Sequence, residues 1–274
     1  MEIKKIGVVG AGTMGGGIAQ VFALYDYGVV LVDTEDAILQ KALEKLKEFT
    51  DHDLWDKVSS LIVISTDFEK LKDCDLIIEA VFEGFSVKKE VFKSINSVCK
   101  KNAIIATNTS SISINKLAAE VADPSRFIGM HFMNPPKVMK LVEIVRGEKT
   151  SEETVEAITE LTKRLDKIPA VVNDSPGFVS NRLLFALIGE AIKLLEKAVA
   201  TKEDIDTVMK YGMNHPLGPI KLADFIGLDI CLNIMQVIYE NLNDDRYKPS
   251  QLLETLVRDG KLGRKTGEGF YKYT

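Results

Sequence analysis

Cysteine is scarce in this sequence, because only Cys74, Cys99 and Cys231 occur among 274 residues. Their odd number and wide separation exclude the disulfide framework that is typical of small secreted proteins. Each lies among aliphatic residues or at the end of an amphipathic stretch, without the glycine-rich or histidine-flanked surroundings that favour a reactive thiolate. We therefore expect reduced structural thiols in a cytoplasmic protein.

Basic charge and long apolar runs are also lacking. The chain has 35 lysines and arginines against 40 aspartates and glutamates, a net charge of -5. A nucleic-acid partner is not expected, because proteins that bind phosphate backbones usually carry a basic excess. No apolar run approaches the ~20 residues that cross a bilayer, and the first residues do not resemble a signal peptide. The sequence therefore predicts a soluble protein with no nucleic-acid or membrane partner, and no metal ligand set is predicted.

The first part of the chain is typical of the α/β class. Short Val/Ile-rich runs alternate with amphipathic stretches of helical length, such as the one that carries Val87, Val91 and Ile95, as βα units of a parallel sheet do. Eight strands are predicted, over 6–9, 29–33, 61–64, 76–79, 103–107, 127–131, 141–145 and 170–172.

The second part is predicted to be all helical. The turn residues 173–177 end the strand runs, and one long helix is expected over 178–199, entered through proline. We therefore predict two domains, residues 1–175 and 176–274. Between 219 and 240 apolar residues occur on almost every side of the expected helical stretch, which implies burial on several sides. About a hundred residues can hardly cover that surface alone, so a homodimer through the helical domain is expected.

A glycine-rich turn follows the first predicted strand. Gly10, Gly12 and Gly15 form G-x-G-x-x-G after a buried strand and at the start of a helix that begins near Thr13-Met14. In a dinucleotide site the first glycine permits the tight turn, the second lets the pyrophosphate approach the backbone, and the third lets helix and strand pack closely. The helix start offers unpaired N–H groups to phosphate. The pattern predicts a Rossmann-type dinucleotide-binding domain with a mostly parallel sheet.

The cofactor is predicted to be NAD. Asp33 ends the second predicted strand, where a carboxylate can accept hydrogen bonds from the ribose hydroxyls of the adenosine. The same carboxylate would repel the 2′-phosphate of NADP, and no arginine lies near Asp33 in the sequence to receive that phosphate.

Four polar residues are candidates for catalysis, because parallel sheets place ligands beyond the carboxyl ends of their strands. His131 closes a strand and can serve as the base that removes a hydroxyl proton as hydride leaves. Glu143, in the next strand, can orient the imidazole and stabilise the imidazolium. Ser110 and Asn181 can hydrogen-bond the developing oxyanion. Structural alternatives exist: a strand-end histidine, Ser110 or Ser111 as helix N-caps, and a polar residue on an exposed helix face for Asn181.

These residues lie in motifs that resemble those of the short-chain L-3-hydroxyacyl-CoA dehydrogenases, most closely their 3-hydroxybutyryl-CoA group. The resemblance covers nearly the whole chain. It rests on the segments 6–15, 108–111, 131–135, 174–178 with Asn181-Arg182, 216–219 with Asp224, and 263–271.

The resemblance implies oxidation of a 3-hydroxyacyl-CoA, or reduction of acetoacetyl-CoA, in fatty acid and butanoate metabolism. It makes His131 the base and Glu143 its partner. It places the substrate against Ser110, Asn134 and Asn181. It places NAD beside Asp33, Glu83, Lys88 and Asn108, in addition to the glycine-rich turn. The family also forms dimers through its helical domain.

Two departures from the family pattern stand out. The stretch between Asp33 and Leu61, which helps the family to hold coenzyme A, is several residues shorter here, and its lysines have the spacing of a solvated helix face. Gly84 replaces the usual asparagine after Glu83.

Two other functions remain open at this stage. One is a dehydrogenase of another small β-hydroxy acid without coenzyme A, and the other is a crystallin-like or sensor protein that binds NAD without turnover. The two further histidines are interpreted as a solvent-exposed residue, His52, and a turn residue, His215.

Overall fold

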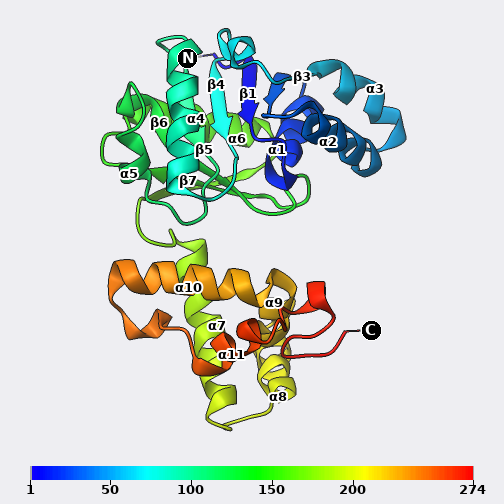
Figure 1. Ribbon diagram of the computed structural model, residues 1–274, viewed down its shortest axis with the longest axis vertical. Helices are drawn as coiled ribbons and strands as arrows, with labels where there is room; N and C mark the ends of the chain where they lie inside the picture. The colour runs from blue at the N-terminus through cyan, green and yellow to red at the C-terminus, as the bar shows by residue number, and fades with distance from the viewer. Residues whose placement is uncertain (1, 274) are drawn as a thin grey trace. The chain divides into compact units, whose positions relative to one another are not determined.

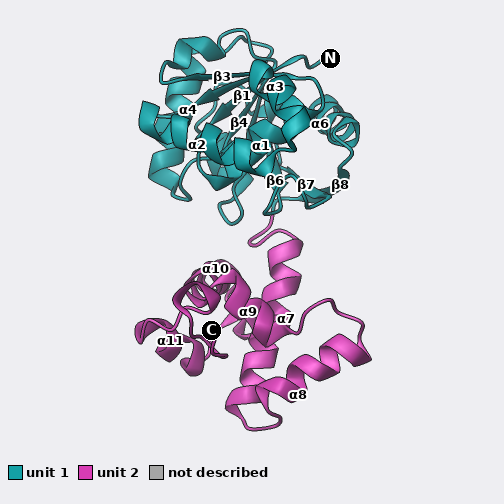
Figure 2. Cartoon of the chain, turned by 90° about the vertical axis from the view of Figure 1, so that its right-hand side faces the viewer, with its two compact units in different colours: residues 1–174 teal, residues 175–274 magenta. Residues whose placement is uncertain are grey.

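The chain forms two compact units in a computed structural model that describes residues 2–273. The first unit comprises residues 1–174 and the second residues 175–274 (Figure 2). This division lies one residue before the predicted boundary. Each unit has its own hydrophobic core and is described by itself below.

The first unit contains one sheet of eight strands, and all eight predicted strands are confirmed to within two residues. In space they follow the order β3-β2-β1-β4-β5-β6-β7-β8. The first six are parallel, whereas β7 pairs antiparallel with β6 and β8 pairs parallel with β7. The strands are β1 Lys5–Val9, β2 Gly28–Val32, β3 Ile62–Ser65, β4 Leu76–Glu79, β5 Ile104–Thr107, β6 Phe127–Phe132, β7 Leu141–Arg146 and β8 Ile168–Asn173.

Helices cover both faces of this sheet (Figure 1). They are α1 Thr13–Leu24, α2 Asp36–Phe49, α3 His52–Leu61, α4 Phe85–Val98, α5 Ile114–Ala118 and α6 Glu152–Arg164. The strand order places β1 between β2 and β4, so consecutive βα units leave β1 in opposite directions. Doubly wound sheets bind ligands at such a reversal, which here lies at the carboxyl ends of β1 and β4.

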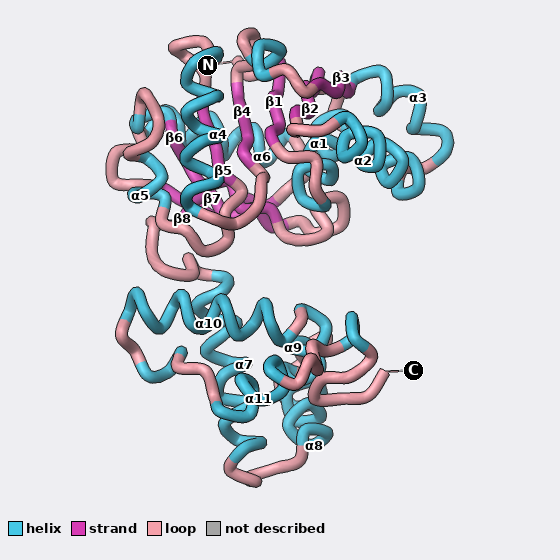
Figure 3. Tube along the Cα trace, in the orientation of Figure 1, coloured by secondary structure: helices cyan, strands magenta, loops and turns pink. Residues whose placement is uncertain are grey.

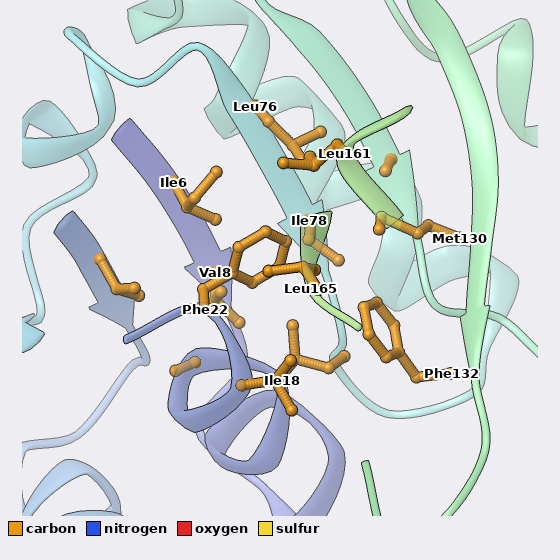
Figure 4. Close-up of a cluster of buried hydrophobic side chains, with 14 of the residues drawn as sticks. Ile6, Val8, Ile18, Phe22, Leu76, Ile78, Met130, Phe132, Leu161 and Leu165 are labelled. Atoms are coloured by element: carbon orange, nitrogen blue, oxygen red, sulfur yellow. The ribbon is translucent and has the colours of Figure 1, made fainter. Parts of the chain in front are cut away.

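Core residues lie on both faces of the sheet, because successive side chains of a strand point to opposite faces. On one face, strand residues pack against α1 and α6 in a cluster that includes Ile6, Val8, Ile18, Phe22, Leu76, Ile78, Met130, Phe132, Leu161 and Leu165 (Figure 4). On the other face, Phe92 of α4 packs edge-on against Phe127, with ring centroids 5.3 Å apart. Such an aromatic pair contributes ~0.5–1.5 kcal/mol beyond its buried area.

The second unit is helical, as predicted (Figure 3). Its helices are α7 Ser180–Glu196, α8 Lys202–Thr207, α9 Pro219–Ile226, α10 Leu228–Leu242 and α11 Gln251–Arg258. The long helix α7 is shorter at both ends than the predicted 178–199. Phe178 and Ala198 have φ values of 48° and 54°, and this left-handed conformation cannot continue an α-helix.

The apolar stretch 219–240 is divided at Gly227, whose φ of 106° breaks the chain into α9 and α10. Ile220, Leu228 and Ile238 are fully buried in the core of the unit, but Phe225 is 62% exposed. Within one chain this stretch is therefore buried mainly on one side. Among the described residues no single helix is long and apolar enough to cross a bilayer, although α9 and α10, bent by 100°, reach that length together.

The C-terminal segment is held by a buried carboxylate. Asp224 of α9 accepts hydrogen bonds from the N–H groups of Phe270 and Tyr271 and from the Tyr273 hydroxyl, at 2.8–2.9 Å. A Cβ at Gly263 would lie 2.2 Å from the Asp224 carbonyl oxygen, so this close approach requires glycine. The residues of the motif at 263–271 are thus explained by the packing of the helical unit.

Candidate active site

Four parallel strands of the first unit end at one edge of the sheet. The register aligns Val9, Glu79, Thr107 and Gly129 in one row across β1, β4, β5 and β6. The segments that follow these positions therefore emerge together: the glycine-rich turn, residues 80–84, residues 108–113 and the end of β6 with His131. Functional residues from distant parts of the sequence are gathered here by the parallel topology.

The glycine-rich turn needs glycine at two positions for different reasons. Gly10 has a φ of 101°, and a Cβ there would lie 2.6 Å from the Ala80 carbonyl oxygen of the neighbouring segment. A Cβ at Gly15 would lie 1.7 Å from the Gly10 carbonyl oxygen, so a side chain there would separate α1 from the turn. At Gly12 a Cβ would meet nothing within 4 Å, so this position faces open space.

The residues present fit an adenine dinucleotide. Gly12 is the N-cap of α1 and no side chain caps the helix, so the first amides, those of Thr13 and Met14 included, point toward the open space at Gly12. A pyrophosphate can approach these amides without meeting a side chain, and the helix dipole favours its negative charge.

Asp33 lies beside this turn, directly after β2. Its Oδ2 accepts a hydrogen bond of 2.6 Å from the Ala11 N–H, and its Oδ1 accepts one of 2.7 Å from the Thr34 N–H. The carboxylate is thus fixed against the glycine-rich turn, where its remaining acceptor capacity can serve the hydroxyls of an adenosine ribose.

His131 and Glu143 form a close pair. They lie directly opposite each other in the antiparallel β6–β7 ladder, and Nδ1 of His131 is 2.9 Å from Oε2 of Glu143. His131 is 7% exposed and Glu143 2%, so the pair is nearly shielded from water. The carboxylate at Nδ1 fixes the orientation of the imidazole ring between the two strands.

Asn108 connects the segment after β5 to this pair. Its N–H donates to the Glu79 carbonyl at 2.8 Å, and its side-chain oxygen accepts from the N–H of Phe132, the residue after His131, at 2.9 Å. The amide side chain therefore fixes the end of β6 relative to the ends of β4 and β5.

Glu83 holds the turn formed by residues 109–111. Its Oε1 accepts hydrogen bonds from the Thr109 hydroxyl at 2.5 Å and from the N–H groups of Ser110 and Ser111 at 3.0 and 3.1 Å. Burial alone would raise the pKa of Glu83, but the Lys88 ammonium and these donors lower it below its ordinary value. The carboxylate therefore stays ionised and keeps the turn in place.

Lys88 lies beneath Glu83 and is only 1% exposed. Its ammonium donates to Glu79 at 2.8 and 3.0 Å and lies 3.2 Å from Oε2 of Glu83. Glu79 was not singled out by the sequence reasoning, although it could have been found as a charged residue that closes a buried strand, the same signal that identified His131.

Ser110 is half-buried in the 109–111 turn, next to the segment that carries Asn108. The proposed alternative role of Ser110 or Ser111 as a helix N-cap is wrong. The helix α5 begins at Ile114, and its N-cap is Ser113, which accepts a hydrogen bond from the Lys116 N–H. Ser113 in turn donates to Asp174 at 2.7 Å.

The remaining predicted site residues lie at two other places. Asn134 is exposed after β6, where it precedes Pro135 through a cis peptide bond. Asn181 belongs to the second unit, as the second residue of α7. The structure thus gathers Ser110, His131 and Glu143 at one edge of the first unit.

The segment between Asp33 and Leu61 forms the helical pair α2 and α3. Lys41, Lys45 and Lys47 are exposed, and Lys57 pairs with Asp26 at 2.8 Å. This arrangement agrees with the solvated helix face that the sequence pattern favoured. His52 is fully exposed, as expected.

Comparison with known proteins places the chain in a family. A model of the 3-hydroxyacyl-CoA dehydrogenase NAD-binding domain matches residues 5–175, and one of the C-terminal domain of the same enzymes matches residues 177–273. The chain belongs to the 3-hydroxyacyl-CoA dehydrogenase family. Its first unit is accordingly the NAD-binding domain, and NAD is its cofactor.

Individual relatives are similar to this chain along nearly its full length. The chain is 49% identical to a probable 3-hydroxybutyryl-CoA dehydrogenase of Deinococcus radiodurans, over 98% of this chain and all of the relative. It is 41% identical to the human mitochondrial hydroxyacyl-coenzyme A dehydrogenase, over 99% of this chain and 91% of the relative. The crystal structure of the (S)-3-hydroxybutyryl-CoA dehydrogenase of Ralstonia eutropha superposes with a TM-score of 0.95, at 45% identity and full coverage of both chains.

Proposed function

We propose that this chain catalyses the reversible NAD-dependent oxidation of (S)-3-hydroxyacyl-CoA to 3-oxoacyl-CoA, with 3-hydroxybutyryl-CoA as its substrate. The observation that carries this proposal is the buried pair of His131 and Glu143 at the edge where the dinucleotide turn also lies. The names of several relatives that are similar along the whole chain support the substrate.

His131 is the general base in this proposal. NAD, when bound, supplies the acceptor for the hydride. Nε2 of His131 takes the hydroxyl proton, because Nδ1 is engaged by Glu143 at 2.9 Å. Glu143 holds the ring in one orientation and stabilises the imidazolium, and such acid–base assistance accelerates reactions by ~10²–10⁴-fold. In the reverse direction the same imidazolium returns the proton to the substrate oxygen.

Ser110 holds the substrate oxygen in this proposal. Glu83 fixes the backbone of its turn, so the hydroxyl is positioned before a substrate arrives. The family resemblance assigns Asn181 as a second donor and Asn134 as a further substrate contact. Glu83, Lys88 and Asn108 are proposed to support the cofactor, and Lys88 does so from beneath the surface because it is buried.

The decisive experiment is the loss of NADH absorbance when the protein is mixed with acetoacetyl-CoA. We expect turnover by the natural protein and a decrease of at least about a hundredfold for His131→Ala. NADH fluorescence should show that the variant still binds the cofactor, and His52→Ala is the matched control on an exposed histidine. Absence of turnover with short, medium and long acyl-CoA substrates would favour an NAD sensor, and turnover of free β-hydroxy acids instead would favour the other dehydrogenase class.

The proposal includes a homodimer formed through the helical unit. Several apolar side chains of this unit remain exposed on the single chain, and they come from separate segments of it: Leu183, Val199, Val208, Phe225 and Ile230. Apolar side chains that lie together in one exposed patch mark surfaces that another protein covers, and the proposal takes these residues as part of such a patch. A second copy of the chain covers them in the proposed dimer.

The cytoplasm is the proposed location. Cys74 and Cys231 are buried, and burial raises the pKa of these thiols to about 11 and about 12. Such thiols are unreactive near neutral pH, and all three cysteines are free thiols. Reduced structural thiols support a reducing compartment.

A further inference from the structure

Glu79 is a buried carboxylate for which the mechanism above has no role. It is the last residue of β4 and is 0% exposed. Its Oε1 accepts from the Val81 N–H at 2.8 Å and its Oε2 from the Thr107 hydroxyl at 2.7 Å. Both oxygens also accept from the Lys88 ammonium. One side chain thus ties together the ends of β4 and β5 and the first turn of α4.

Lys88 is surrounded by two carboxylates. Its ammonium lies between Glu79, which is inside the unit, and Glu83, which is partly exposed. A side chain that is 1% exposed does not reach a bound ligand directly. Its effect on the site therefore passes through Glu83.

Glu83 divides its two oxygens between the lysine and the turn. Oε2 faces the Lys88 ammonium, whereas Oε1 accepts from Thr109, Ser110 and Ser111. The division is possible because Glu79 already satisfies the ammonium from the other side. A buried ammonium with one carboxylate partner would attract both oxygens of that partner, since an uncompensated buried charge is costly.

We propose that Glu79 is a positioning residue, which balances the Lys88 ammonium so that Glu83 can hold the 109–111 turn and present Ser110. This inference rests on the proposed function in one respect, namely that Ser110 binds the substrate oxygen. Without Glu79, Glu83 turns toward the lysine, the amides of Ser110 and Ser111 lose their acceptor, and the turn loosens.

The first test is Glu79→Gln, which keeps the shape of the side chain and removes its charge. We expect kcat with acetoacetyl-CoA to fall about tenfold to a hundredfold, as small misplacements of a substrate contact do. The dissociation constant of NADH should change less than kcat does, because the glycine-rich turn and Asp33, which follow β1 and β2, do not depend on Glu79 even though Glu83 and Lys88 also support the cofactor. Asp75→Asn is the matched control, since it removes the carboxylate partner of Lys100 at the opposite end of the same strand. This control should leave kcat unchanged.

The second test is the double variant Glu79→Gln with Lys88→Met. Removing both members of a buried ion pair is often close to neutral, whereas removing one leaves a buried charge. Glu83 then keeps its hydrogen bonds to the turn, so kcat should recover at least severalfold relative to Glu79→Gln alone. Removing both charges also restores stability if the role of Glu79 is merely structural, so amide exchange of the turn, together with kcat, separates positioning from stability.

Hydrogen exchange of the Ser110 and Ser111 amides tests the positioning without any substrate. We expect exchange at least about tenfold faster in Glu79→Gln than in the natural protein, with protection restored in the double variant. This readout stands even if no acyl-CoA is turned over, so it separates a failure of the present inference from a failure of the proposed function. If Glu79→Gln does not fold, protected amides in the double variant support the inference.

Two results would overturn the inference. One is unchanged amide exchange and unchanged kcat in a folded Glu79→Gln variant. The other is a double variant whose turn amides exchange as fast as those of an unfolded segment.

Discussion

Nδ1 of His131 and Oε2 of Glu143 lie 2.9 Å apart because their residues are direct partners in the antiparallel ladder of β6 and β7. Opposite residues of such a ladder project from the same face with close Cβ atoms. The backbone of two strands inside the sheet therefore sets the distance between imidazole and carboxylate. A pair built in this way keeps its geometry without support from mobile loops.

The first prediction concerns Glu143→Gln. The amide cannot stabilise an imidazolium, and it can hold the ring in the wrong tautomer. We expect kcat for acetoacetyl-CoA reduction to fall by ~10²–10⁴-fold while NADH binding is retained. Steady-state kinetics and NADH fluorescence on the same preparation measure both effects. Glu156→Gln, on an exposed position of α6, is the control and should behave as the natural protein. A Glu143→Gln variant with full activity would exclude His131–Glu143 as the catalytic pair.

The second prediction concerns the stability contributed by Glu83. Lys88 and the donors of the turn lower its pKa in spite of burial, so the ionised form is favoured in the folded protein. A lowered folded pKa gives stability that is present above the unfolded pKa of ~4.3 and is lost as the pH falls through the folded value. Glu83→Gln should therefore cost about 1.5–3 kcal/mol at neutral pH, the range of hydrogen bonds to charged groups, and progressively less below about pH 4.

Urea unfolding of both proteins at neutral and acidic pH measures this difference. Glu160→Gln serves as the comparison, because Glu160 forms an exposed pair with Lys163 and should matter far less. A Glu83→Gln effect that is constant across the pH range would show that ionisation of Glu83 does not hold the turn.

Much of the site could be predicted from the order of residues along the chain. The glycine-rich turn and Asp33 have fixed places after the first two strands of a dinucleotide-binding unit, so their positions followed from the strand pattern. The close pairing of His131 and Glu143 could be predicted from the chemistry of the two residues. The antiparallel ladder that brings them together was not predicted. The connection 133–140 is too short for a parallel crossover, and this signal could have predicted the antiparallel pairing of β6 and β7.

Other features depend on three-dimensional packing that no local pattern encodes. Lys88 lies in the first turn of a helix, where a lysine is usually exposed to solvent. It is buried here because its ammonium pairs with Glu79 at the end of β4. Ser113 rather than Ser110 caps α5, because Glu83 binds the backbone N–H groups of Ser110 and Ser111 and so delays the start of the helix. The segment 110–113 contains three serines, so the residue type alone left the N-cap undetermined from sequence.

The third prediction concerns cofactor choice. Asp33→Ala removes the carboxylate that is fixed against the Ala11 N–H and that would repel a 2′-phosphate. We expect KM for NADH to rise about tenfold or more, because charge-assisted hydrogen bonds to the ribose are lost. The ratio of kcat/KM for NADPH to that for NADH should increase at least as strongly. Kinetics with both cofactors test this, with Glu35→Ala as the exposed neighbouring control. An unchanged ratio would place the adenosine elsewhere.

The fourth prediction concerns Lys167, which precedes β8. Its buried ammonium donates to the carbonyl oxygens of Pro136 at 2.6 Å and Met139 at 2.8 Å, so it holds the loop between β6 and β7. Lys167→Met leaves these carbonyls without their donor and should cost about 1–3 kcal/mol of unfolding free energy. Urea unfolding measures the loss. Lys163→Met, on the exposed face of α6, should change stability little, and equal effects of the two variants would contradict the anchoring role.

The last prediction tests the proposed dimer. Phe225 of α9 is 62% exposed on the single chain, and in the proposed dimer a second copy covers it. Phe225→Glu places a charge in that interface, which opposes association because burying a carboxylate among apolar side chains is costly. Sedimentation velocity should show a monomer at a concentration where the natural protein is a dimer. Val63→Glu, on the edge strand β3 of the first unit, adds the same charge at an exposed position and should leave the dimer intact. A dimer that survives both Phe225→Glu and Ile230→Glu would show that the helical surface around α9 and α10 is not the interface.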